Sequence, residues 1–151
     1  MRVGIRKIQN KEDEQVIIEC TEVTEEITEI YDYVSYKGTE ISGISENGQL
    51  RRFSLKEVYY FEAVDEKIFA YAEDNVFELK MRLYEVEKMY KNQHFVRCSK
   101  SVVMNLMMLE GISPALNGRF FAHMSNGEKL IISRQYAAGI KKIVMGGKVN
   151  E

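Results

Sequence analysis

Cysteine is scarce in this sequence, with only Cys20 and Cys98 among 151 residues. Two cysteines cannot build the disulfide framework that stabilises many small secreted domains, so we expect two reduced and mostly buried thiols. Pro114 is the single proline, and no stretch is dominated by one residue type. This cysteine usage favours a cytoplasmic protein.

Long apolar runs are also missing. No segment approaches the roughly 18 consecutive apolar residues that indicate a transmembrane helix. The N-terminal sequence MRVGIRKIQNKEDEQ lacks the continuous apolar region of a signal peptide. Since 45% of the residues are apolar, the chain can bury the core of one domain and still leave a small extension.

Residues suited to catalysis or metal binding are few. His94 and His123 have no Cys, His or Asp at the spacing of a metal site. Cys98, Ser99 and Lys100 could be drawn as an activated nucleophile, but nothing in the sequence supplies an orienting base or an oxyanion loop. No glycine-rich phosphate loop occurs. The sequence predicts no enzyme, no metal site, no cofactor and no small-molecule substrate.

Charge is distributed unevenly along the chain. Residues 1–50 carry 5 Lys+Arg against 11 Asp+Glu, a balance of -6, whereas residues 51–151 carry 16 against 12, a balance of +4. From His94 onward, 8 basic residues face 3 acidic ones. An acidic first part and a basic second part indicate that the second part binds a polyanion, although many solvated surfaces look similar.

Hydrophobic periodicity predicts a small α/β extension in the first 48 residues. A short β-rich run covers residues 15–20, and helical spacing follows from the expected N-cap Thr24 to Gly38. Residues 40–45 and 49–55 are expected to form strands joined by a tight turn at Asn47-Gly48. We therefore expect an acidic strand–helix–strand unit over residues 1–48, which could support dimerisation or regulation.

The remaining residues, 49–151, predict a mainly antiparallel β domain. Strands are expected at 58–64, 68–72, 76–80, 95–98, about 107–113, 119–125 and 129–133. A helix is expected over 82–91, and a second one from the N-cap Ser133 to Gly146.

Several cations and hydroxyls occur where strands end. They are Lys67 in one turn, then Arg97, Ser99, Lys100 and Ser101 in another, and Arg134 with Gln135 at the start of the last helix. Loops at strand ends can converge on one edge of a β fold, where Lys and Arg can neutralise phosphates and reach base edges. A cation at a helix N-terminus opposes the helix dipole, so Arg134 is poorly placed for stability. Alternatively, each is a solvated loop residue.

Six ordered motifs resemble the LytTR family of bacterial DNA-binding domains. They are VYYFE (58–62), FVRCSKSVVMNL (95–106), ISP (112–114), NGRF (117–120), NGEK (126–129) and ISRQY (132–136). The resemblance extends from about residue 49 to residue 145. It implies an elongated, mostly antiparallel, sandwich-like β fold with short helices. It also implies that loops, not a recognition helix, enter successive major grooves of double-stranded DNA and bend it.

The resemblance also implies roles for the strand-end residues in a sequence-specific transcriptional regulator. Lys100 and Arg134 would reach bases, and Lys67 would add a contact from a loop of variable length. The supporting or phosphate-binding positions would be Arg97, Ser99, Ser101 and Gln135. Asn105 would order the bend after the SVVM segment. Cys98 would be a small buried residue. Alternatively, Cys98 is a redox-sensitive thiol whose pKa is lowered by the charges of Arg97 and Lys100.

Family members commonly carry a receiver domain of about 120 residues before this domain, but here about 50 residues precede it, without a phosphate-accepting aspartate pocket. We therefore expect a stand-alone member, of a sort whose partners are sometimes inhibitory membrane proteins. A homodimer is expected through the aromatic face of the first helix, formed by Tyr31, Tyr33 and Tyr36. The alternative function is a protein-interaction module that regulates a partner without binding DNA.

Overall fold

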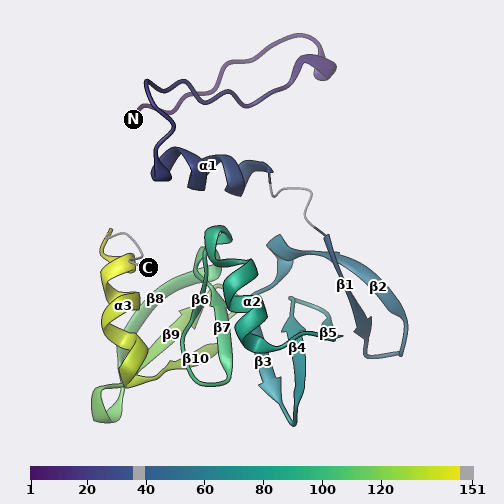
Figure 1. Ribbon diagram of the computed structural model, residues 1–151, viewed down its shortest axis with the longest axis vertical. Helices are drawn as coiled ribbons and strands as arrows, with labels where there is room; N and C mark the ends of the chain where they lie inside the picture. Colours follow the sequence, from purple (N-terminus) through teal and green to yellow (C-terminus); the bar gives the residue numbers. More distant parts are fainter. Residues whose placement is uncertain (36–39, 147–151) are drawn as a thin grey trace.

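The computed structural model describes residues 1–35 and 40–146, and Figure 1 shows the arrangement of the elements. The strands are β1 (Glu40–Ser45), β2 (Leu50–Ser54), β3 (Tyr60–Val64), β4 (Lys67–Tyr71), β5 (Val76–Leu79), β6 (Phe95–Arg97), β7 (Val102–Asn105), β8 (Leu109–Pro114), β9 (Phe120–Met124) and β10 (Lys129–Ile132). The α-helices are α1 (Glu25–Ser35), α2 (Leu83–Met89) and α3 (Arg134–Val144). Single turns of 3-10 helix are η1 (Lys11–Asp13), η3 (Leu55–Glu57), η4 (Lys91–Gln93), η5 (Leu106–Met108) and η6 (Leu116–Gly118).

The strands form two sheets. A seven-stranded sheet, which we call the large sheet, has the order β2-β1-β5-β4-β3-β7-β6, and a three-stranded small sheet has the order β10-β9-β8. The paired strands of both sheets run antiparallel to each other. Since most strands pair with a neighbour in sequence, short turns suffice to connect them. The predicted mainly antiparallel β fold with short helices is confirmed.

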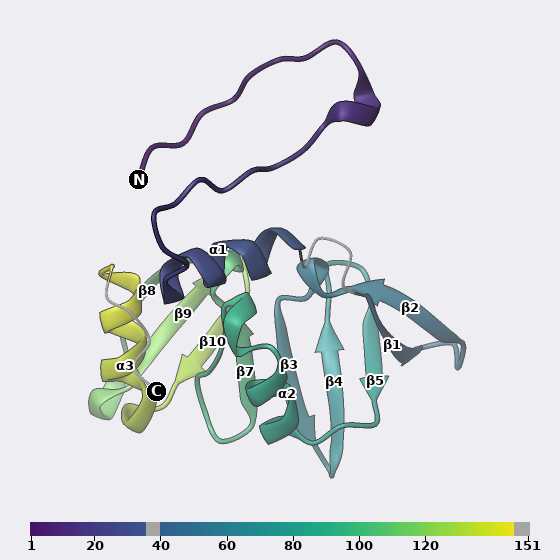
Figure 2. The ribbon, with the colours of Figure 1, turned by 45° about the horizontal axis from the view of Figure 1, so that its top comes forward.

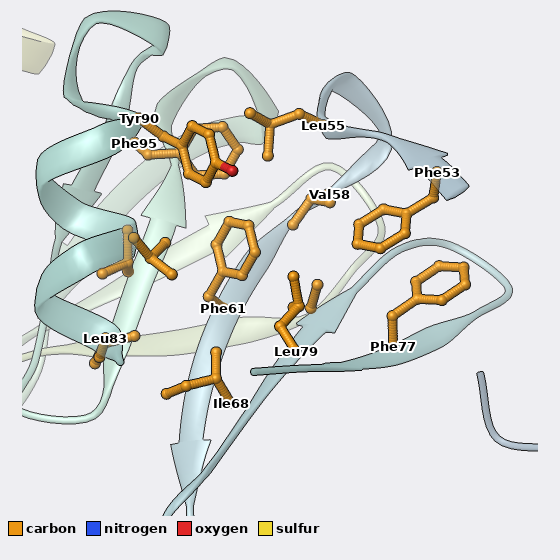
Figure 3. Packing of buried hydrophobic residues seen from close by; sticks show 13 residues of the cluster. Phe53, Leu55, Val58, Phe61, Ile68, Phe77, Leu79, Leu83, Tyr90 and Phe95 are labelled. Atoms are coloured by element: carbon orange, nitrogen blue, oxygen red, sulfur yellow. The ribbon is translucent and has the colours of Figure 1, made fainter. Parts of the chain in front are cut away.

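One face of the large sheet packs against α2. Side chains of the sheet and the helix alternate inward to form a first core, in which Phe61, Val86 and Val103 are fully buried. The Phe61 and Phe95 rings lie 5.4 Å apart between centroids, and Figure 3 shows them with Tyr90 beneath the helix. Within the helix expected over 82–91, Leu83, Val86 and Tyr90 are buried, whereas Met89 is 58% exposed.

The opposite face of the large sheet packs against the small sheet and α3. This second core joins Tyr60 and Met104 of the large sheet to Ala122 and Ile132 of the small sheet and to Ile140 of α3. Neighbouring residues of one strand point to opposite faces, so Tyr60 and Phe61 contribute to different cores. The end of α3 also follows the prediction, since Gly146 adopts a left-handed φ of 93° after the helix.

Asn105 fixes the bend after β7, as the sequence predicts. Its side-chain amide is buried, and Nδ2 donates to the carbonyl of Val58 at 2.9 Å. Its Oδ1 accepts from the N–H of Met107 at 3.0 Å, which caps η5. A buried amide with both ends paired orders the chain at this point.

The N-terminal part departs from the prediction in two respects. Residues 15–20 form no strand, because no neighbouring strand is present among the described residues to pair with them. Cys20 is exposed, whereas Cys98 is buried as expected. α1 begins after Thr24, whose Oγ1 accepts from the N–H of Ile27 at 3.3 Å, but the predicted helix end at Gly38 lies outside the described residues.

Strand β1 belongs to the large sheet. It pairs with β2 across the turn that contains Gly48, and Ile44 also pairs with Glu78 of β5. The predicted boundary between residues 48 and 49 therefore falls inside a hairpin of this sheet. Within residues 1–35 and 40–146, no helix has the length and apolar character needed to cross a membrane.

Candidate nucleic-acid interface

Strand register brings two of the predicted site loops to one end of the large sheet. β3 ends and β4 begins at the paired residues Val64 and Lys67. β7 begins beside this turn, with Val102 opposite Glu62, and β6 ends opposite Val103. The turn between β3 and β4 and the loop between β6 and β7 therefore lie side by side.

One backbone hydrogen bond joins the end of β3 to the β6–β7 loop, and a second joins this loop to the start of α3. The N–H of Ala63 donates to the carbonyl of Ser101 at 2.8 Å, and the N–H of Ser133 donates to the carbonyl of Cys98 at 2.8 Å. All three segments lie along the lower edge of the molecule in Figure 2. We call this region the loop end; it comprises residues 64–67, 98–101, 118–119 and 133–135.

Arg97 braces the loop between β6 and β7 from inside. Its Nε donates to the carbonyl of Ser99 at 2.9 Å, and its Nη2 donates to the carbonyl of Lys100 at 2.7 Å. Its Nη1 also pairs with Glu87 of α2 at 3.1 Å, and only 18% of the side chain is exposed. The guanidinium is thus used to hold the loop in shape.

The serines of this loop also shape its backbone. The hydroxyl of Ser99 accepts from the N–H of Ser101 at 3.3 Å, which closes a local turn. Both serines are half-buried, whereas Lys100 between them is exposed. No hydrogen bond or ion pair to another described residue engages the Lys100 ammonium. The loop therefore presents Lys100 outward on a braced backbone.

Arg134 and Gln135 are both exposed at the first turn of α3. A Cβ atom added to Gly118 would lie only 2.9 Å from Cδ of Arg134, so the stem of Arg134 rests on the bare backbone of this glycine. Within the described residues, the Arg134 guanidinium has no hydrogen-bond or ion-pair partner. The helix N-terminus and the cation together create a positive potential that suits a phosphate group.

Lys67 lies at the loop end in a less basic setting. The turn before it contains Asp65 and Glu66, both with positive φ and both exposed. Its Nζ lies 3.8 Å from a carboxylate oxygen of Glu78 on β5. Two exposed acids and an ion pair reduce the positive potential at this turn.

Arg119 is a further cation of the loop end that the sequence reasoning did not select. It directly precedes Phe120, which pairs with Ile132, so it lies across from the start of α3. The side chain is exposed, and its Nε donates to the carbonyl of Leu116 at 3.1 Å. The signal in the sequence was a cation directly after the Asn117-Gly118 turn.

Cys98 lies beneath these cations as a buried thiol. Burial raises its pKa to about 12, and the Arg97 charge offsets only part of that rise. A thiol with such a pKa is protonated at neutral pH, so it packs as a small apolar residue. Across the residues that the structure describes, no cluster of His, Cys, Asp or Glu could hold a metal ion.

The loop end resembles a surface built for a polyanion: cations at strand ends, a helix N-terminus and a braced backbone. Residues 48–145 match the protein family described as the LytTr DNA-binding domain. The chain belongs to this family. Solved structures agree, because the LytTr DNA-binding domain of a candidate methyl-accepting/DNA response regulator from Bacillus cereus superimposes with a TM-score of 0.64. It is 27% identical and the match covers 72% of this chain and 97% of that chain.

Relatives of this LytTR chain include proteins of Staphylococcus aureus that are named uncharacterized HTH-type transcriptional regulators. One from strain NCTC 8325 is 30% identical over 94 residues, which cover 62% of this chain and 63% of the relative. One from the bovine strain RF122 is 32% identical over 88 residues, which cover 58% and 59%. The match therefore spans less than two thirds of the length of these relatives.

The described part of the LytTR chain contains no helix-turn-helix unit, despite the names of these relatives. Strands β1 to β5 separate α1 from α2, and strands β6 to β10 separate α2 from α3. A helix-turn-helix needs two helices joined by a turn of a few residues. The exposed cations of the loop end lie instead at strand ends, in turns and in the first turn of α3.

Proposed function

We propose that this protein is a transcriptional regulator that binds double-stranded DNA in a sequence-specific manner through the loop end. The observation that supports this proposal best is the joining of Lys100 and Arg134 to one rigid surface. The β6–β7 loop that carries Lys100 is hydrogen-bonded directly to Ser133, which precedes Arg134. Because the segments that carry them are hydrogen-bonded to each other, Lys100 and Arg134 can contact the same duplex.

In this proposal the two side chains have the base-reading role. An arginine or lysine can bond to O6 and N7 of a guanine in the major groove, and a good contact of this kind discriminates by about 1–3 kcal/mol. Gln135, Arg119 and the first N–H groups of α3 would bind phosphates and fix the register. Ser99 and Ser101 would support the loop and could add phosphate contacts at its surface.

Arg97 and Lys67 have secondary roles in the proposal. Arg97 would position Lys100 through the two loop carbonyls that it binds, so we assign it a positioning role in addition to the phosphate contact expected from the sequence. Lys67 would approach DNA only if it left Glu78. The contact of Lys67 with DNA stays a prediction. Inhibition of this protein by a membrane protein also stays a prediction.

Binding of the full chain to two labelled duplexes tests this function. One duplex is selected from a random library by the protein itself, and the other is a scrambled sequence of equal length. We expect Arg134→Ala to weaken binding to the selected duplex by about 10- to 100-fold, corresponding to one lost bidentate contact. Binding to the scrambled duplex should weaken much less. The control is Arg51→Ala, an exposed cation on β2.

Two outcomes would count against the proposal in different ways. Equal losses on both duplexes for Arg134→Ala would refute the base-reading role but keep DNA binding. If the wild-type protein binds no duplex even at low ionic strength, where phosphate contacts are strongest, the protein-interaction module becomes the better interpretation.

A further inference from the structure

Residues 1–23, which we call the N-terminal arm, extend away from the rest of the molecule in both ribbon views (Figures 1 and 2). The arm consists of a first limb, residues 1–10, and a second limb, residues 14–23, on either side of η1. Every residue of the arm is exposed except Ile18, which is partly shielded. Among the residues that the structure describes, the arm therefore has almost no packing partner.

The exposed surface of the arm is strongly apolar. In the first limb Val3 is 93% exposed and Ile5 is 99% exposed. In the second limb Val16, Ile17 and Val23 are all at least 66% exposed. Single apolar side chains on a surface are ordinary, but a contiguous apolar segment indicates an interaction site.

The backbone of the arm is equally unpaired. Within residues 1–23 the backbone hydrogen bonds are those of Asp13 to Asn10 and Glu14 to Lys11, both in the turn around η1. The two limbs lie on opposite sides of a gap lined by residues such as Gly4, Ile8 and Gln15, so they do not pair with each other. Extended limbs with free N–H and C=O groups are suited to pairing with another strand.

The distribution of charge along the arm indicates which strand each limb could pair with. Residues 1–11 contain Arg2, Arg6, Lys7 and Lys11 and no acidic residue. Residues 12–23 contain Glu12, Asp13, Glu14, Glu19 and Glu22 and no basic residue. Each arm thus carries one basic limb and one acidic limb, and each limb complements the opposite limb of another copy.

We propose that two copies of this chain dimerise by pairing their arms, the first limb of each with the second limb of the other. This arrangement is symmetric, since the same pair of surfaces meets twice. Pairing would give residues 15–20 the partner strand that a single chain lacks. It would also bury the exposed valines and isoleucines of both limbs and place basic side chains across from acidic ones.

The arm leaves the molecule at the end opposite the loop end. The α1 helix that follows it packs on η4, where the rings of Tyr33 and His94 lie 5.4 Å apart, and His94 precedes the strand whose far end is Arg97. Dimerisation through the arms therefore leaves both loop ends uncovered. The proposal does not depend on DNA binding.

The same packing argues against the helix face that the sequence suggested for the dimer. Tyr33 is half-buried between His94 and Lys56, whose Nζ lies 5.3 Å from the ring centroid. Tyr31 stays 62% exposed, and Tyr36 lies outside the described residues. With Tyr33 turned inward, the exposed apolar surface of this region is concentrated in the arm.

Charge reversal of one limb at a time tests the proposal on the full chain, without DNA, by sedimentation equilibrium. The first variant, Arg6→Glu with Lys7→Glu, replaces two cations of the first limb by carboxylates, and the second, Glu19→Lys with Glu22→Lys, replaces two carboxylates of the second limb by cations. We expect either change to raise the Kd of self-association roughly tenfold or more, because like charges then face each other at both pairings. A matched control, Arg51→Glu with Lys80→Glu, applies the same charge change to exposed residues of the large sheet and the turn after it.

Mixing the two variants supplies the decisive measurement. The first and the second variant should form a heterodimer at least as tight as the wild-type homodimer, because the carboxylates added to one then face the cations added to the other. A chain with all four changes should again self-associate. A wild-type chain that stays monomeric at about 100 µM would overturn the proposal, since a specific dimer should be formed there. So would single-limb variants that self-associate like the control, or variants that fail to pair on mixing. In each case the DNA-binding test above keeps its own result.

Discussion

Arg97 and Arg134 lie at the same end of the molecule, yet their surroundings assign them different tasks. The guanidinium of Arg97 is bonded to two loop carbonyls and to Glu87. That of Arg134 is exposed above Gly118. A guanidinium with its donors already used stabilises the protein, whereas one with open donors is available to a ligand.

At the residue scale, we predict that Arg97→Ala lowers the free energy of unfolding by about 1–3 kcal/mol, because two hydrogen bonds to loop carbonyls are lost. Glu87→Gln should cost less than about 1 kcal/mol, since the carboxylate is 43% exposed and water screens the ion pair. Urea unfolding of both variants measures the difference. Equal losses would mean that the ion pair, not the loop contacts, dominates.

The two cysteines should differ sharply in reactivity. Burial raises the pKa of Cys98 to about 12, so its thiol is protonated at pH 8, whereas Cys20 is exposed. We predict that a disulfide reagent modifies one thiol per native chain rapidly and both thiols after denaturation. Cys20→Ser should abolish the rapid phase. Rapid modification of Cys98 in that variant would favour the redox-sensitive alternative instead.

At the scale of elements, η6 and α3 position Arg134 together. Gly118 has a φ of 74°, and a Cβ atom there would also overlap Arg134 Cγ at 3.1 Å. Gly127, in the turn between β9 and β10, has a φ of 88°, but a Cβ atom added there would meet no contact within 4 Å. Substitution of Gly127 therefore introduces backbone strain alone, whereas substitution of Gly118 introduces the same strain and also displaces Arg134.

We therefore predict that Gly118→Ala and Gly127→Ala each destabilise the fold by about 1–2 kcal/mol, the cost of a left-handed conformation for a residue with a Cβ atom. Only Gly118→Ala should also weaken binding to the selected duplex, because the Arg134 stem must move. Thermal unfolding and duplex titration of both variants give the comparison. A matching loss of affinity in Gly127→Ala would show that strain alone is responsible.

At the scale of the whole molecule, a polar contact joins the two sheets. The hydroxyl of Tyr60, on β3 of the large sheet, donates to Glu128 at 2.8 Å in the turn between β9 and β10 of the small sheet. Burial, and then this hydrogen bond, raise the pKa of Tyr60 far above its usual value of 10. The folded protein therefore keeps this proton at a pH where the unfolded chain loses it.

The sign of the pH dependence follows from that difference. The stability linked to Tyr60 is fully present below pH 10 and is lost as the pH rises above 10 toward the folded pKa. We predict that the free energy of unfolding falls above pH 10, and that Tyr60→Phe makes the fall less steep. Tyr71 and Tyr90, whose pKa values are also raised by burial, would supply the remaining slope. An unchanged slope in Tyr60→Phe would contradict the assignment.

Local patterns in the sequence were sufficient for most elements of this protein. Apolar patterns predicted the strands of both sheets except β7 (Val102–Asn105), and helical spacing predicted α2 and α3, because these periodicities follow from backbone geometry alone. The Asn-Gly turns and the capping residue Thr24 were readable for the same reason. The motifs that resemble the LytTR family also named Lys100 and Arg134, since they are contiguous in the chain.

Only the tertiary structure decided which strand ends meet and which cations stay open. The order of strands and their register join residues far apart in sequence, such as Cys98 with Ser133, and no local pattern encodes that pairing. The same long-range contacts turned Arg97 inward and partly buried Tyr33, and within the described residues they left residues 15–20 without a partner strand. Burial and hydrogen bonding depend on neighbours in space, so they had to be seen in the folded chain.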